Sequence, residues 1–461
     1  MRFGIVLLIL FYAYSSNAQK IHSTDHQIDG QWIVEFHSAD IGVVRTVFDI
    51  ETKGSSFEAW TRKGATRDIL GFWKSMLAKI FTNDFKNGTL LRIEDGIRSE
   101  KKDTVVLSGI FRSAMGNYYF NGEIVNDHLE AVLKDGNLKQ RGTLSGNRAK
   151  KISMPLDDYS KIVSEAIDTA KKKIYNRKEL ETKDWKKFER KISKKAPGFE
   201  DDVELVFAFY YFASSLPFSH FALTRLEQDK SQLRQSKKKQ YLFLEEKNNQ
   251  TAILRITSFG GSTTEVDSVF SVIHKNNYDN LIVDLRNNSG GTVEAGMAFA
   301  RNVIDTSLTG GFFLTQNWFN EHDLIPNQEQ LDQLPKFSEA NYELIIQGIH
   351  REKGLRLKVE PSEINFNGNL YIITNRSTAS TCEPIVHGLK AAGRATIVGE
   401  KTAGAMLNGE RFNLSSGFSL FVPTADYYTM DGYRIDQNGV DPNIMLKDED
   451  PVDFIIEQLI E

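Results

Sequence analysis

The chain has 461 residues, of which 40% are hydrophobic and 26% charged, the composition of a globular protein with two or three domains. Its 33 Gly and 10 Pro exclude collagen-like and proline-rich architectures, and a formal net charge of −4 gives no reason to expect a nucleic-acid partner. A single cysteine, Cys382, excludes an internal disulfide.

Residues 1–18 have the pattern of a signal peptide. Arg2 precedes a short apolar stretch from Ile5 to Tyr14, and Ser16-Asn17-Ala18 supplies small residues for cleavage after Ala18. No later segment approaches the roughly 20 apolar residues of a membrane-spanning helix. The sequence therefore predicts a soluble protein without membrane insertion, exported to the periplasm or the extracellular space.

Residues 19–150 are predicted to form a β-rich domain. Short runs of Val, Ile, Phe, Tyr and Thr alternate with turn signals such as Asp95-Gly96 and Asp135-Gly136. An antiparallel barrel or sandwich fits this pattern best. The domain shows no catalytic constellation, so its role stays unknown. The eight predicted strands are 31–37, 42–51, 56–61, 89–94, 104–112, 118–125, 129–134 and 138–145.

The hydrophobic period changes to that of helices in residues 151–235, which predicts a small helical bundle. From residue 236 to 461, short buried strands alternate with helices, as in an α/β core with a mostly parallel sheet. The strands are expected at 252–257, 281–285, 370–374 and 396–399, with helices at 293–303 and 384–392. Residues 305–365 are more polar and predict an irregular insertion or lid.

Two strand–turn–helix segments of this core could carry chemistry. Asp284–Gly291 contains adjacent glycines before a helix, a turn that can hold phosphate or form half of an oxyanion hole, or serve only as a connection. Thr374–Glu383 places several hydroxyls and the Cys382 thiol at a helix start, where a nucleophile benefits from the helix dipole. Ser377 could instead simply cap that helix.

A third candidate is the pair Ser219-His220, just after the predicted bundle. His387 is a rival base because it is close in sequence to the second segment. It lies seven residues after Ser380, however, which is roughly 10 Å along a helix and too far for a direct hydrogen bond.

Four stretches together resemble the S41 peptidases, which include the C-terminal processing peptidases, the tricorn core protease and retinoid-binding relatives. The resemblance covers about residues 250–446 and does not reach the β domain. The stretches are Asp284–Gly291, Ser380–Glu383, Gly393–Gly404, and Tyr427–Thr429 with Gly439–Ile444.

The resemblance implies Ser380 as nucleophile, with Cys382 as its neighbour. It implies oxyanion donors from the amide of Thr381 and from a glycine amide of the Gly290-Gly291 turn. C-terminal processing peptidases have a lysine base at the position of Ala405, so a Ser–Lys dyad is not expected here.

The tricorn-like branch instead takes its base from an upstream Ser-His pair, which is similar to Ser219-His220. The same branch has an acidic residue, more often Glu, at the position of Asp436. Between His220 and the first core strand there is no room for a PDZ domain of roughly 80–100 residues.

The predicted function is thus a secreted or periplasmic serine endopeptidase that hydrolyses peptide bonds through a Ser-His-acid arrangement and an acyl-enzyme. Its partner would be a peptide or protein substrate. An alternative is an inactive relative that binds peptide or an apolar ligand in the same cleft, and a third is carbohydrate or phosphate handling. No metal-ligand motif occurs, so neither a metal nor another cofactor is expected. The sequence does not indicate the oligomeric state.

Overall fold

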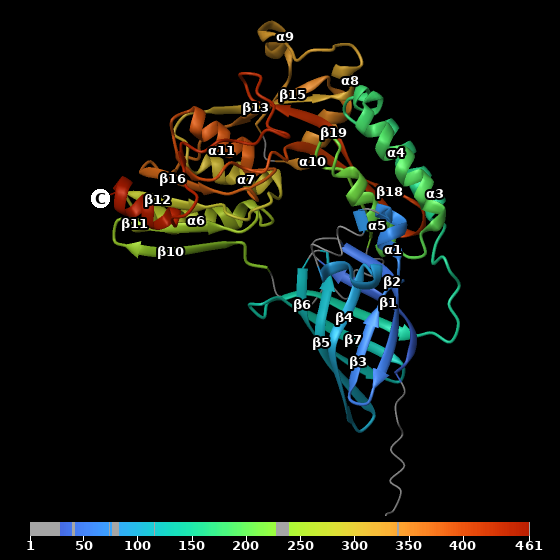
Figure 1. Cartoon of the computed structure of the whole chain (residues 1–461). Helices are drawn as coiled ribbons and strands as arrows, with labels where there is room; N and C mark the ends of the chain where they lie inside the picture. Colours follow the sequence, from blue (N-terminus) through green and yellow to red (C-terminus); the bar gives the residue numbers. More distant parts are fainter. Residues whose placement is uncertain are drawn as a thin grey trace, which may run out of the picture.

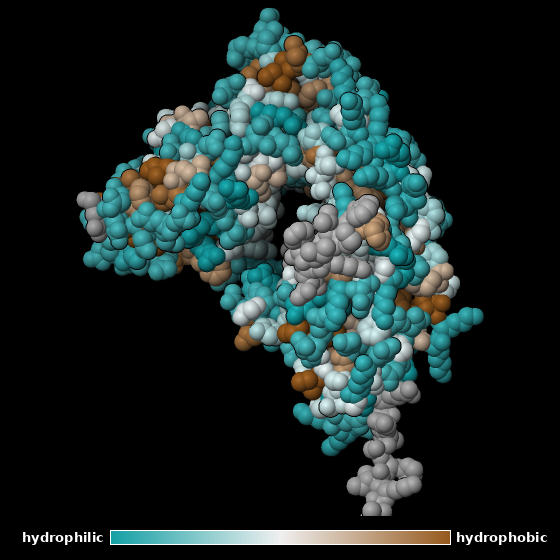
Figure 2. Space-filling view, in the orientation of Figure 1, coloured by the Kyte–Doolittle hydropathy of each residue, from teal (hydrophilic) through white to brown (hydrophobic). Residues whose placement is uncertain are grey.

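The computed structural model describes residues 28–38, 42–72, 74–75, 83–114, 116–226, 239–338 and 341–460. The predicted signal peptide lies outside these residues. Within them, no helix combines the length and apolar character needed to cross a membrane. On the face drawn in Figure 2, hydrophilic residues predominate and the molecule is hollowed between its lower and upper parts.

Residues 30–148 form a closed barrel of eight antiparallel strands, drawn in blue to teal in Figure 1. Each strand pairs with the next along the chain, and β1 pairs with both β2 and β8, so the barrel keeps no free edge. All eight predicted strands occur. They are β1 (Gly30–Ser38), β2 (Gly42–Lys53), β3 (Ser56–Trp60), β4 (Leu91–Lys101), β5 (Thr104–Ser113), β6 (Gly116–Val125), β7 (His128–Lys134) and β8 (Gln140–Arg148). A short helix, α1 (Ala65–Leu70), follows β3.

Three helices follow the barrel: α3 (Tyr159–Lys173), α4 (Lys183–Lys195) and α5 (Asp202–Ala213). Their N-termini are capped by the side chains of Asp158, Thr182 and Asp201, each of which accepts a hydrogen bond from a first-turn amide. The predicted bundle therefore forms where the change of period indicates it.

The barrel is not isolated from the rest of the chain. Strand β9 (Ala222–Arg225) pairs with β2 through Val43 and Arg225, and its other edge pairs with β19 (Phe418–Tyr428). From β19 the same sheet continues through β13 (Leu308–Thr315), β15 (Gly354–Val359) and β14 (Lys336–Phe337), with β18 (Leu407–Asn413) also paired to β19. The segment between bundle and core thus joins all parts of the molecule.

Residues 305–365 are more regular than the sequence suggests. The segment contributes β13 and β15 to the large sheet, with α8 (Gln316–Phe319), α9 (Gln328–Gln333) and α10 (Tyr342–Arg351) between them. The physical reason is the apolar run Phe312–Leu314, whose side chains are buried and hold β13 against β19. Polar connections on both sides obscure this short run in the sequence.

A second sheet has six strands in the order β10-β11-β12-β16-β17-β20, parallel except for β10. Its strands are β10 (Leu242–Asn248), β11 (Thr251–Ile256), β12 (Asn280–Asp284), β16 (Asn369–Thr374), β17 (Thr396–Gly399) and β20 (Ile444–Met445). The multidomain fold class with an α/β core is confirmed.

Helices cover both faces of this sheet. Leu281 and Val283 pack on one face with α6 (Thr263–Asn276), α7 (Val293–Arg301) and α11 (Cys382–Ala391), while Ile282 packs on the other with α12 (Pro451–Ile455). Since the strands are parallel, the turns that follow β12, β16 and β17 meet at one edge of the sheet. These turns contain the sequence motifs.

Candidate active site

Ser380 lies in the turn between β16 and α11. Its backbone φ is 56°, a left-handed conformation that a non-glycine residue keeps only when neighbouring contacts impose it. The hydroxyl of Thr378 donates to the carbonyl of Leu285 (2.9 Å), and the amide of Ala379 donates to the carbonyl of Asn288 (3.0 Å). Ser380 Oγ has no hydrogen-bond partner among the described residues, so this hydroxyl is not engaged elsewhere.

The glycine turn after β12 lies directly beside Ser380. A Cβ added to Gly290, whose φ is 97°, would lie 2.7 Å from Ser380 Cβ and 3.0 Å from the amide nitrogen of Thr381. Glycine is therefore required at this position. The amide of Gly290 donates to Asn288 Oδ1 (2.9 Å), whereas those of Gly291 and Thr381 have no acceptor within the described chain. Of the predicted oxyanion donors, the Gly291 and Thr381 amides remain available.

Ser219 and His220 lie between α5 and β9. The next side chain, Phe221, packs into the helical bundle, with ring centroids 5.7 Å from Trp185 and 5.2 Å from Phe209. His220 itself has a φ of 58°, again in the left-handed region. The anchored aromatic ring and the pairing of β9 thus fix the backbone that presents the imidazole.

A hydrogen-bonded relay joins His220 to Asp436 through Ser219. Ser219 Oγ donates to Asp436 Oδ1 (2.5 Å) and lies 2.7 Å from His220 Nδ1. Because the hydroxyl has a single hydrogen, Ser219 Oγ accepts from Nδ1–H, which leaves Nε2 as the unprotonated nitrogen. The structure therefore brings the adjacent pair Ser219-His220 to Asp436, which lies 217 positions after Ser219 in the sequence.

Asp436 is fully buried, and its remaining hydrogen bonds come from the backbone and from an arginine. The amide of Met406 donates to Oδ1 (3.1 Å) and Arg434 donates to Oδ2 (3.4 Å). Burial lowers the pKa of His220, and the negative charge of Asp436 opposes that effect. The imidazole is thus kept neutral, as a general base requires.

Glu383 connects the nucleophile turn with the relay. Its buried carboxylate accepts from the amides of Ser380 (3.0 Å), Gly404 (2.7 Å) and Ala405 (2.9 Å) and from the hydroxyl of Thr402 (2.6 Å). The next amide along the chain, that of Met406, donates to Asp436 Oδ1. Two successive amides thus tie the Ser380 half of the site to the His220 half.

No hydrogen bond joins Ser380 Oγ to His220 Nε2 within the described residues. The His220 ring lies against Phe421, at 5.6 Å between centroids. Catalytic hydrogen bonds are often long or misaligned in ligand-free structures and tighten when substrate binds.

The competing candidates lie in unsuitable surroundings. Cys382 is buried in the core, where desolvation raises the pKa of its thiol to about 12, so it stays protonated. His387 stacks on Tyr433, at 6.3 Å between centroids, and has no hydrogen bond to Ser380. Lys401 pairs with Asp441 (3.3 Å). Of the two histidines, only His220 is hydrogen-bonded to a relay that ends in a buried carboxylate within the described residues.

Sequence reasoning assigns no role to Glu383, although it makes four hydrogen bonds within the site. A signal for it exists in the sequence: Glu383 is an acidic residue in the first turn of a helix, between Cys382 and the apolar run Pro384–Val386. Such a side chain needs buried partners. Those partners come from the loop after β17, which lies far from Glu383 along the chain.

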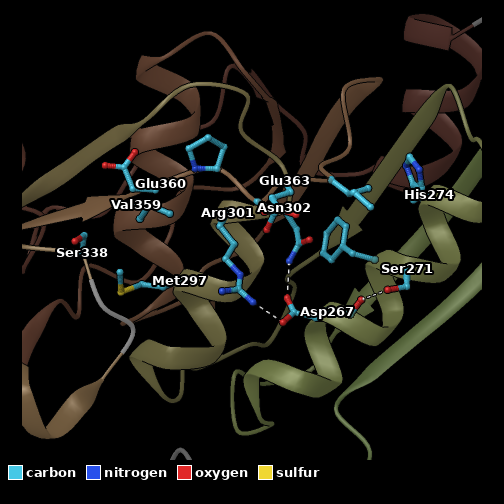
Figure 3. A pocket seen from close by; sticks show the side chains of 14 residues that line it. Asp267, Ser271, His274, Met297, Arg301, Asn302, Ser338, Val359, Glu360 and Glu363 are labelled. Atoms are coloured by element: carbon cyan, nitrogen blue, oxygen red, sulfur yellow. Dashed lines mark hydrogen bonds and ion pairs between the residues drawn. The ribbon is translucent and has the colours of Figure 1, made fainter.

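A separate cavity of about 720 Å³ lies behind α7 and contains none of the predicted site residues. Figure 3 shows Arg301 and Asn302 pointing toward Asp267, which accepts hydrogen bonds from both. Its charged groups are thus partly paired with each other. Among the described residues, no group of three His, Cys, Asp or Glu side chains is arranged to hold a metal ion.

Comparison with known proteins gives a consistent result for the α/β core. Residues 250–446 match peptidase family S41. The chloroplastic C-terminal processing peptidase of Tetradesmus obliquus is 27% identical over 203 residues, which are 43% of this chain and 36% of that protein. The carboxyl-terminal-processing protease of a Picosynechococcus species is 25% identical over 208 residues, 45% of this chain and 42% of that protein.

The chain thus spans less than half the length of these two relatives, and the barrel lies outside the matched residues. Among solved structures, the photosystem II D1 C-terminal processing protease superposes with a TM-score of 0.40 and 16% identity, covering 63% of this chain and 94% of that one.

Proposed function

We propose that residues 250–446, which match peptidase family S41, form the core of a serine-type peptidase, and that the whole chain hydrolyses peptide bonds in peptide or protein substrates. Ser380 is the nucleophile and His220 the general base, while Ser219 and Asp436 orient the base. The observation that supports this proposal is the relay from Asp436 through Ser219 to His220, which is connected to the Ser380 turn because the consecutive amides of Ala405 and Met406 donate to Glu383 and Asp436.

In the first step, His220 Nε2 accepts the proton of Ser380 Oγ as the oxygen attacks the substrate carbonyl. The imidazole becomes positively charged, and its Nδ1–H bond to Ser219 strengthens because the donor is now ionised. The Asp436 carboxylate stabilises that charge through the Ser219 hydroxyl. This is the role that the acid has in a serine-peptidase triad, with one hydroxyl inserted.

The carbonyl oxygen becomes an oxyanion in the same step. The free amides of Gly291 and Thr381 are positioned to donate to it, since Gly290 brings the two turns into contact. His220 then protonates the leaving amine, and the acyl-enzyme is hydrolysed by water that His220 activates in the same way. No step requires a metal.

The proposal includes export of the chain, because residues 1–18 have the n-region, apolar region and small-residue cleavage site of a signal peptide. Expression in a secreting host followed by N-terminal sequencing tests this part separately. The expected mature chain starts at Gln19, and an uncleaved chain that stays in the cytosol would contradict it.

Labelling with a fluorophosphonate probe tests the catalytic proposal. The probe is expected to modify Ser380 in the wild-type protein, and Ser380→Ala and His220→Ala are each expected to abolish labelling. His387→Ala is the matched control, because this half-buried histidine lies on the helix that follows Ser380 but has no hydrogen bond to it. Peptide-library cleavage then defines the preferred sequence.

Labelling that survives in His220→Ala but disappears in His387→Ala would overturn the assignment of the base. Folded wild-type protein that reacts with neither probe nor peptides would contradict peptidase activity altogether. The fold of each variant is checked by thermal unfolding.

A further inference from the structure

A second cavity, of about 660 Å³, lies where the end of the barrel meets α5 and β9. Figure 1 shows α5 beside α1, above the end of the barrel. None of the candidate catalytic residues lines this cavity, and it lies outside residues 250–446. Its apolar lining includes Val44, Leu90 and Leu91 of the barrel side, Val206 and Phe207 of α5, and Leu223 of β9.

The serine and threonine hydroxyls of the lining are already hydrogen-bonded within the protein. Those of Ser113 and Ser214 donate to nearby backbone carbonyls at 3.1 Å and 2.8 Å, and that of Thr224 accepts from Arg411 at 2.6 Å. The interior therefore offers apolar contact and few polar groups. Its volume falls in the range of roughly 300–1,000 Å³ that is typical of small-molecule sites.

Helix α5 indicates that this surface accommodates an apolar group. Its sequence from Val203 to Ala213 is apolar except for Glu204 and the tyrosine hydroxyls, and a helix that is apolar all round is normally covered on every side. Among the α5 residues that line the cavity, Val203 and Phe209 are buried, but Tyr210 is 75% exposed. Burying this aromatic surface would be favourable.

Two lysines lie near the part of the cavity edge formed by Tyr211. Lys74 Nζ donates to the hydroxyl of Tyr211, a lining residue, at 2.8 Å, and Lys191 Nζ lies over the ring of Phe212 at 5.5 Å from its centre. Burial, together with the charges of Lys187 and Lys74, lowers the pKa of Lys191. Within the described residues, neither Lys74 nor Lys191 forms an ion pair with an acidic side chain. An anion at this edge would relieve the crowding of like charges.

We propose that this cavity binds a long-chain fatty acid, with the acyl chain against α5 and the barrel and the carboxylate beside Lys74 and Lys191. The charge at the edge favours an anionic head group, and the apolar lining favours an apolar chain. A peptide segment fits less well, since its backbone amides and carbonyls would be buried without partners. Binding here does not depend on the proposed peptidase activity.

Titration with cis-parinaric acid, a fluorescent fatty acid, tests the proposal on the full mature chain. We expect saturable binding of one molecule, displaced by oleate and much less by oleyl alcohol, which lacks the charge. The double variant Lys74→Ala/Lys191→Ala is expected to weaken binding by about ten-fold, the loss of one charge-assisted contact. Lys186→Ala is the matched control, because Lys186 is an exposed lysine of the same helix as Lys191, and should bind like wild type.

A blocked cavity and a cross-link locate the site. Val206→Trp fills the cavity from α5 and should abolish binding, provided that its thermal unfolding remains cooperative. In the wild-type protein, a photoreactive fatty acid should form adducts on residues 203–214 or 90–91. Absence of saturable binding, adducts confined to other segments, or equal affinity for oleate and oleyl alcohol would each overturn the proposal.

Discussion

Removal of one hydroxyl, by Ser219→Ala, tests the proposed relay most directly. The substitution disconnects His220 Nδ1 from Asp436, because Ser219 Oγ is the atom between them. The bond from Ser219 to Asp436 exists before and during the reaction, so its loss affects both states. The bond from Nδ1–H strengthens only when the imidazole becomes charged, and its loss therefore raises the barrier.

The expected magnitude follows from that single bond. A hydrogen bond to a charged partner contributes about 1.5–3 kcal/mol, and each 1.36 kcal/mol changes a rate tenfold, so kcat/KM should fall by roughly 10- to 150-fold. Ser219→Thr keeps the hydroxyl and should retain activity within a few-fold. A purely structural defect would not be rescued in this way.

Steady-state cleavage of a quenched peptide between pH 4.5 and 9 provides the measurement. The Ser219 hydroxyl accepts from Nδ1–H of His220 and so stabilises the charged ring. Its removal in Ser219→Ala should lower the pKa of His220, and the acid limb of the kcat/KM profile should move to lower pH. Wild-type kcat/KM with an unchanged profile in Ser219→Ala would refute the relay. Thermal unfolding of each variant excludes loss of fold as the cause.

Three other perturbations have defined outcomes. Asp436→Asn removes the negative charge that stabilises the charged form of His220, so kcat/KM should fall by about 10²- to 10⁴-fold. Burial already lowers the pKa of His220, and loss of the charge should move the acid limb of the profile to still lower pH. Gly290→Ala places a Cβ against the nucleophile turn and should lower kcat by about 10²- to 10³-fold, because it displaces the oxyanion donors. Gly393 also has a positive φ but open space around it, so Gly393→Ala should not lower kcat. Equal effects of the two substitutions would contradict the steric argument. Burial raises the pKa of Asp201 to about 7, above the pKa of the same carboxyl in the unfolded chain. The folded state therefore keeps a proton that the unfolded state releases, and the free energy of unfolding falls as the pH rises to about 7. Each pKa unit by which the folded chain exceeds the unfolded chain lowers the free energy of unfolding by about 1.4 kcal/mol at high pH. Urea unfolding should therefore show that Asp201→Asn is more stable than wild type at pH 8 but not at pH 4. An unchanged pH dependence would show that Asp201 is not the group that titrates.

The secondary structure of this protein was largely predictable because it depends on local pattern. Alternating apolar residues and turn dipeptides indicated all eight barrel strands, and the change of period indicated α3, α4 and α5. Several core elements, among them α6, β13, β18 and β19, were not predicted. In β13, three buried residues between polar connections are too few to show a period. Closure into a barrel, rather than a sandwich, depends on the pairing of β1 with β8, which no local pattern specifies.

The sequence by itself determined the motifs of the candidate site and the edge of the sheet where they lie. Strand–turn–helix segments after parallel strands must meet at the carboxyl ends, so Ser380 and Gly290 could be expected together. The residue types left several hydroxyls and one thiol as possible nucleophiles. The resemblance to S41 peptidases singled out Ser380 and the oxyanion donors and, because Ala405 stands where a lysine base is expected, Ser219-His220.

Only the tertiary structure decided how the two halves of the site connect. Asp436 reaches Ser219 because β9 pairs with β19, a strand about 200 residues away in the sequence, and because Phe221 is anchored in the bundle. Glu383 acquires its role because the loop after β17 folds over it. The cavity between barrel and α5 likewise exists only after the domains pack. Such features depend on which distant surfaces meet, whereas strands, helices and turns depend on neighbours along the chain.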